Sequence, residues 1–117
     1  MRVEVYYNLH KKTFSVRALS GPNKGRVVMH TNEIALKDVK FVVRESGRKK
    51  VLEEKRKNVH AFVRGDMVDG ISFDNAGTAT YNPYRYSSFV NTETKSPVYQ
   101  ASSVLMVNSD VPCILYA

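Results

Sequence analysis

The segment Arg2-Val3-Glu4-Val5-Tyr6-Tyr7 decides the fold of this 117-residue chain. Its alternate residues divide into an apolar and a more polar set, which is the period-two pattern of a half-buried β-strand. The polar break Asn8–Lys12 follows, and Thr13-Phe14-Ser15-Val16-Arg17 resumes the alternation. The two segments together predict an N-terminal β-hairpin.

Further short strands are expected along the rest of the chain. The turn-forming residues Gly21–Gly25 precede the first of these strands. Asn108-Ser109-Asp110 is compatible with the turn of a final hairpin. A loop is expected at Asp74–Thr80. The expected strands are Arg26–His30, Val39–Val43, Val59–Arg64, Ile71–Phe73, Ser87–Asn91, Pro97–Val107 and Val111–Tyr116.

One helix is expected, over about residues 46–57. Strong helix formers follow Ser46 and Gly47, and Asn58 is a reasonable C-terminal stop. Only Val51 and Leu52 are apolar within it, so its attachment to a core would be narrow. We therefore predict an α+β fold, a mostly antiparallel β-sheet with one basic helix, in a single domain of residues 1–117.

Positive charge is concentrated in the first part of the chain. Residues 1–65 hold 16 Lys and Arg against six acidic residues, or +10, whereas residues 66–117 hold two against five, or −3, which together give the net +7. A positive field on a small protein points to an anionic partner, and phosphate is the commonest such anion.

Several classes of protein are disfavoured. The sequence has no run of 18 apolar residues, so no membrane-spanning helix is expected. The N-terminus lacks the apolar stretch of a secretory signal, and a cytosolic location is expected. The single Cys113 lies in an apolar run, and no metal site or Gly-rich nucleotide loop is present. A pair among His10, His30 and His60 remains open for phosphodiester chemistry, but we expect a protein that is not an enzyme and needs no cofactor.

Two segments have the residue types of a nucleotide site. In the cation-rich segment Arg48–Arg64, Arg56 is the best candidate, because its guanidinium can bind phosphate bidentately near the end of the expected helix. The second segment offers aromatic planes on which a base can stack, together with polar groups that can read base edges or ribose hydroxyls. It contains Tyr81, Asn82, Tyr84, Arg85, Tyr86, Phe89 and Asn91.

Three stretches resemble a small bacteriophage protein family, the first-described Thoeris anti-defence proteins. They are Tyr7–Arg17, Phe41–Arg48 and Glu54–Val63, and the resemblance extends over most of the chain. It implies a homo-oligomer in the host cytoplasm that binds cyclic ADP-ribose isomers, and in some members cyclic oligonucleotides, without cleaving them, in pockets between subunits. It also implies arginines for the phosphates and an aromatic residue plus an asparagine for the base and ribose.

The residues that match this pattern are Arg17 and Arg56 for the phosphates and Phe89 and Asn91 for the base and ribose. A third arginine of the family, near the C-terminus, has no counterpart, because nothing basic follows Lys95. Together with Tyr84 and Arg85 from the tyrosine-rich segment, these residues form the predicted ligand site.

Two other functions remain open. The +10 segment and the basic helix would also suit a small nucleic-acid-binding protein, which would contact many backbone phosphates. The same basic surface could instead block an acidic host enzyme.

Overall fold

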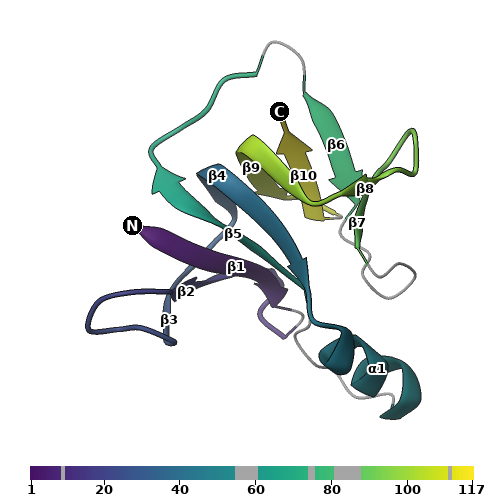
Figure 1. Cartoon of the computed structure of the whole chain (residues 1–117). Coiled ribbons are helices and arrows are strands. Elements are labelled where there is room, and N and C mark those ends of the chain that lie inside the picture. Colours follow the sequence, from purple (N-terminus) through teal and green to yellow (C-terminus); the bar gives the residue numbers. More distant parts are fainter. Residues whose placement is uncertain (9, 55–60, 74–75, 81–87, 111) are drawn as a thin grey trace.

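The computed structural model describes residues 1–8, 10–54, 61–73, 76–80, 88–110 and 112–117. Ten strands in this part of the chain form one sheet in which every pairing is antiparallel (Figure 1). The strands are β1 Arg2–Asn8, β2 Thr13–Ala18, β3 Val27–Thr31, β4 Glu33–Val43, β5 Ala61–Val68, β6 Gly77–Thr80, β7 Phe89–Asn91, β8 Pro97–Val98, β9 Gln100–Asn108 and β10 Pro112–Tyr116, and the helix α1 spans Glu45–Glu54.

The strand order requires the sheet to curl. The order is β3-β2-β1-β5-β4-β9-β10-β6-β7-β8, so three strands separate β3 from β4. Only Asn32 connects these two strands along the chain. The end of β3 must therefore lie beside the start of β4, and the first five strands bend round to bring them together. Asn108 of β9 holds this corner, because its backbone N–H donates to the Asn32 carbonyl at 2.8 Å and its side-chain amide donates to Asn32 Oδ1 at 2.9 Å.

One apolar core joins the two ends of the sheet. Val3 and Val5 of β1 are fully buried, as the N-terminal alternation predicted. Phe41 of β4 contacts Phe89 of β7, with ring centroids 5.1 Å apart, and Tyr116 of β10, at 6.3 Å. The C-terminal strands thus fold over the same face of the sheet that Val3 and Val5 occupy, and their aromatic rings close the core.

The α+β class predicted from the sequence is wrong. The described strands form a single β-sheet, and α1 is a ten-residue helix within the connection between the neighbouring strands β4 and β5 (Figure 1). Gly47 is its only buried residue, and Leu52 is 50 % exposed. Because the helix has no apolar stripe, it cannot pack on the sheet as a second layer. It begins at Glu45, one residue before the predicted start, and the predicted end at residue 57 lies outside the described residues.

Of the other sequence predictions, some are confirmed and some are wrong. The N-terminal hairpin is confirmed, with Val5 of β1 opposite Val16 of β2. No strand forms at Ile71–Phe73, and the predicted loop Asp74–Thr80 contains β6. β6 has no large apolar residue, and it forms because β10 and β7 pair with its two edges. Within the described residues, no helix is both long and apolar enough to cross a membrane.

Gly65 of β5 is required where β5 meets β4. A Cβ at this position would lie 2.9 Å from the Lys37 carbonyl oxygen, closer than real Cβ atoms come to a backbone atom, and in a tight contact of 3.0 Å with Leu36 Cβ. We predict that Gly65→Ala lowers the free energy of unfolding by about 1–3 kcal/mol, measured by urea denaturation. Gly70→Ala is the matched control, because a Cβ there meets nothing within 4 Å. Equal effects of the two changes would contradict this packing.

Candidate functional site

The face of β1 opposite the core holds a charged side chain where a sheet normally carries solvent-exposed residues. Glu4 is only 1 % exposed. It pairs directly with Arg17 on β2 and with Arg64 on β5, and directly paired residues of an antiparallel sheet point to the same face. The alternation of β1 therefore sends Val3 and Val5 into the core and Glu4 to the other face, between two arginines.

Three arginines surround the Glu4 carboxylate and form what we call the arginine cluster. Oε2 accepts a hydrogen bond from Arg17 Nε at 3.0 Å and a second from the same guanidinium. Oε1 accepts from Arg64 Nε at 2.8 Å and, at 3.4 Å, from Arg44 Nη2. The cluster combines three cations and one anion, so it has two positive charges in excess.

The environment of Glu4 stabilises its ionised form. Burial alone would raise the pKa of the Glu4 carboxyl, but hydrogen bonds from Arg17 and Arg64, together with their positive charges, outweigh that effect and lower the pKa below its ordinary value of 4.5. The arginines remain accessible, because the Arg17, Arg64 and Arg44 side chains are 26 %, 36 % and 48 % exposed. Glu4 thus holds the arginines in place without consuming all of their hydrogen-bonding capacity.

An aromatic pair lies beside the arginines. The guanidinium carbons of Arg17 and Arg44 lie 5.0 Å and 4.4 Å from the centroid of the Phe62 ring. Tyr6 meets the same ring edge-on at 5.9 Å. Cation–π contacts of this kind hold the guanidinium groups near the ring, so less side-chain entropy is lost when they bind a ligand.

The positive face continues past the cluster. In the strand register, Arg2 of β1 and Lys37 of β4 both lie opposite Asp66 of β5, and Lys40 of β4 lies opposite Arg64 of β5. Their side chains therefore leave the sheet on the same side as that of Arg64. Beside them lies a hollow of about 520 Å³, lined by Arg2, Asp38, Val39, Lys40, Gln100, Ala101, Ser102 and Ala117. It forms at a bulge in β4, where Asp38 has a φ of 51° and its carbonyl accepts from Arg2 Nη1 at 3.1 Å. The basic face, as we use the term, is the arginine cluster with Phe62, Tyr6 and this hollow.

Of the residues predicted from the sequence as a ligand site, Arg17 lies on the basic face. Phe89 is buried in the core against Phe41, on the opposite side of the sheet. The Asn91 side chain donates to the Tyr116 hydroxyl at 2.8 Å and accepts from the backbone N–H groups of residues 93 and 94, which shapes a turn. The structure therefore does not bring Arg17 together with Phe89 or Asn91 within one chain. Arg56, Tyr84 and Arg85 lie outside the described residues.

Sequence reasoning did not single out Glu4, Arg44, Arg64 or Phe62. The alternation did place Glu4 on the face away from Val3 and Val5. Its arginine partners come from β2, from β5 and from the residue between β4 and α1, however, and which residues face Glu4 depends on strand register. Among the histidines, His30 Nδ1 lies 2.9 Å from Ser15 Oγ in a polar contact two residues along β2 from Arg17.

Comparisons with known proteins place these residues inside a matched region. The model of a family described as "Mycobacterium phage L5 gene 82 protein" matches residues 1–113. The Gene 82 protein of Mycobacterium phage L5 is 40 % identical to this chain over 118 residues, which cover 95 % of this chain and 94 % of that protein. No solved structure matches the chain.

The coupling between Glu4 and its arginines predicts how stability depends on pH. Because the pKa of Glu4 is lower in the folded state, the unfolded chain binds this proton more readily. The contribution of Glu4 is therefore complete above pH 4.5 and is lost as the pH falls through the lower folded pKa. Glu4→Gln should cost about 3 kcal/mol at neutral pH and should flatten this acid dependence. Urea denaturation from neutral pH to about pH 3 measures both effects.

Glu93→Gln is the control, because Glu93 is an exposed carboxylate outside the cluster. It should leave the acid dependence unchanged. If Glu4→Gln instead keeps the acid dependence of the parent protein, Glu4 is not the group that couples pH to folding.

Proposed function

This chain belongs to the Mycobacterium phage L5 gene 82 protein family, and from that premise we propose that it is a phage protein that binds and sequesters a small cyclic nucleotide without cleaving it. The ligand class follows the resemblance to Thoeris anti-defence proteins, namely cyclic ADP-ribose isomers or cyclic oligonucleotides made in the host cytoplasm as immune signals. The observation that carries the proposal is the arginine cluster around Glu4.

The excess charge of the cluster favours a bound anion. Glu4 neutralises one of the three guanidinium charges, and the remaining two match the charge of a pyrophosphate. One guanidinium group can donate two parallel hydrogen bonds to the oxygens of a phosphate, and such charge-assisted hydrogen bonds are about twice as strong as neutral ones. Because the arginines are already aligned by Glu4 and Phe62, a ligand would not have to order them.

A nucleoside could occupy the hollow next to the cluster. The hollow has about 520 Å³ and lies within the size range of small-molecule sites. Gln100 and Ser102 offer donors and acceptors for a base or a ribose, and Lys40 lies between the hollow and Arg64. A phosphate on the arginines and a nucleoside in the hollow would together use the whole basic face.

The same chemistry favours holding a ligand rather than cleaving it. The buried carboxylate of this face is Glu4, whose pKa is lowered and whose two oxygens are occupied by arginines. A carboxylate in that state is a weak base and does not supply a proton near neutral pH. Because the basic face is open in one chain, we propose that the pockets lie between subunits of a homo-oligomer, as the resemblance implies.

Retention of a nucleotide tests the proposal directly. The purified protein is incubated with cyclic ADP-ribose isomers and cyclic oligonucleotides, washed and heat-denatured, and the released molecules are identified by mass spectrometry. We expect intact ligand. Arg44→Gln should weaken binding at least about tenfold, because a charge-assisted hydrogen bond is lost, while the fold is kept because Arg44 makes the longest of the three contacts to Glu4.

Lys11→Gln is the matched control, since it removes one charge from an exposed turn between β1 and β2. It should retain ligand like the parent protein. Failure to retain any of these nucleotides would refute the proposal, and recovery of a cleaved product would make the protein an enzyme.

A second candidate function is nucleic-acid binding, and the extension of the basic face favours it. Arg2, Lys37 and Lys40 add three cations to the three arginines, and two carboxylates stand against these six cations, Glu4 in the cluster and Asp66 at 3.6 Å from Arg2. The net positive charge is enough to follow several backbone phosphates. Salt separates the two functions. A protein that neutralises six phosphates should lose about 10³-fold in affinity between about 50 and 200 mM salt, whereas one holding two phosphates should lose about tenfold. We expect the smaller loss, measured by titration with a radiolabelled cyclic nucleotide.

A further inference from the structure

The two edge strands of the sheet differ in how they are protected against pairing. β8 is only two residues long and begins with Pro97, which has no N–H to offer to another strand. β3 is five residues long and contains no proline, lysine or acidic residue. Edge strands usually carry such residues to prevent association. In β3 the one such feature is a bulge at Val28, where the pairing with β2 shifts between Val16 and Arg17.

β3 also exposes apolar side chains on both of its faces. Val27, Val28 and Met29 are 42 %, 38 % and 41 % exposed. Val27 pairs with Arg17 on the basic face, whereas Met29 pairs with the buried Val16 on the core side. Three consecutive exposed apolar residues are unusual on a monomeric protein, and at an edge strand they indicate a surface that another strand covers.

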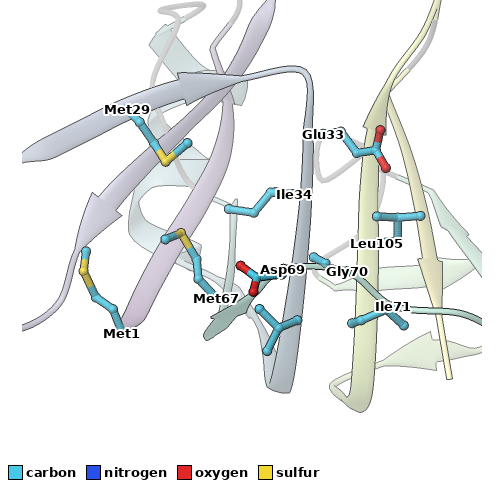
Figure 2. Close-up of a pocket in the computed structure, with 11 residues that line it drawn as sticks. Met1, Met29, Glu33, Ile34, Met67, Asp69, Gly70, Ile71 and Leu105 are labelled. Atoms are coloured by element: carbon cyan, nitrogen blue, oxygen red, sulfur yellow. The ribbon is translucent and has the colours of Figure 1, made fainter.

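A groove on the core side continues this apolar surface. It measures about 520 Å³, and three of the four methionines of the chain, Met1, Met29 and Met67, lie along one side of it (Figure 2). The other apolar side chains that line it are Ile34, Ala35, Val68, Ile71 and Leu105. Methionine adapts its shape to a partner surface, so a groove of this composition suits protein contact.

The charges around β3 favour a second copy of this chain as the partner that covers the strand. Lys24 and Arg26 precede the strand, and Glu33 follows it. Glu33 and Asp69 are also the acidic residues that line the groove. When two copies of β3 run antiparallel, the cations of one copy approach the carboxylates of the other, whereas parallel pairing would bring like charges together. The strand is therefore complementary to itself in one orientation.

We propose that β3 pairs antiparallel with β3 of a second copy of this chain, about a two-fold axis that passes next to Met29. Met29 is the central residue of β3 and meets its own counterpart across the axis. Arg26 then lies opposite the partner's Asn32, next to the partner's Glu33. The pairing satisfies the free backbone edge, buries Val27 and Met29, and joins the two sheets. It stands independently of whether the basic face binds a nucleotide.

Sedimentation velocity at about 50 µM protein tests the proposal, since a specific dimer should be populated at that concentration. We expect the parent protein to sediment as a dimer. Met29→Lys places two cations against each other at the axis, so it should raise the dimer dissociation constant at least tenfold. Tyr99→Lys is the matched control, because Tyr99 is an exposed apolar residue away from β3. It should leave the dimer intact.

A crosslink tests the register of the pairing. In a Cys113→Ser background, Met29→Cys should form an interchain disulfide on mild oxidation, because directly opposed residues in antiparallel strands have Cα atoms about 4.5–5.5 Å apart, within disulfide range. Tyr99→Cys in the same background should not. A monomeric parent protein, a Met29→Lys variant that dimerises like the parent, or equal crosslinking at the two positions would overturn the proposal.

Discussion

One ion-pair network, the burial of Glu4 among three arginines, fixes the arrangement of the basic face. A carboxylate that is 1 % exposed is tolerated in a sheet only because Arg17 and Arg64 on the neighbouring strands, and Arg44 at the end of β4, donate to its oxygens. Each arginine in turn would be repelled by the others without this anion. Glu4 therefore links the registers of β1, β2 and β5 to the position of the cations, so that the fold and the candidate site depend on the same contacts.

The curl of the sheet separates two surfaces with different chemistry. The face with Glu4 is cationic, whereas the face with Val3 and Val5 is covered by the C-terminal strands, which bring Phe89 onto Phe41. The corner at Asn32 leaves β3 as an edge with an apolar groove behind it. A single alternating segment at the N-terminus thus assigns residues to both surfaces, and the β3 edge is a third surface, at which we propose that a second copy pairs.

The sequence was sufficient for local features and insufficient for those that depend on register. The alternation in Arg2–Tyr7 predicted the first hairpin and the face of the strand on which Glu4 lies. The resemblance to a phage protein family pointed to Arg17 as a site residue. The cluster could not be assembled from the sequence, because Arg44 and Arg64 reach Glu4 through pairings 40 and 60 residues away. The α+β class was wrong because helix formers predicted a helix correctly but could not show that Gly47 is its only buried residue, so that the helix forms no second layer on the sheet. β6 was missed because its residues form a strand only through their neighbours.

Side-chain NMR of the arginines tests the central claim that the Glu4-bound guanidinium groups form the anion site. The hydrogen bonds to Glu4 protect the Nε–H protons of Arg17 and Arg64 from exchange with water, so that their NMR signals can be observed. On titration with a cyclic nucleotide, these two signals should shift together and saturate, while that of the exposed Arg26 stays in place. A nucleotide that shifts Arg26 or the helix arginine Arg48, and leaves Arg17 and Arg64 unmoved, would contradict the account.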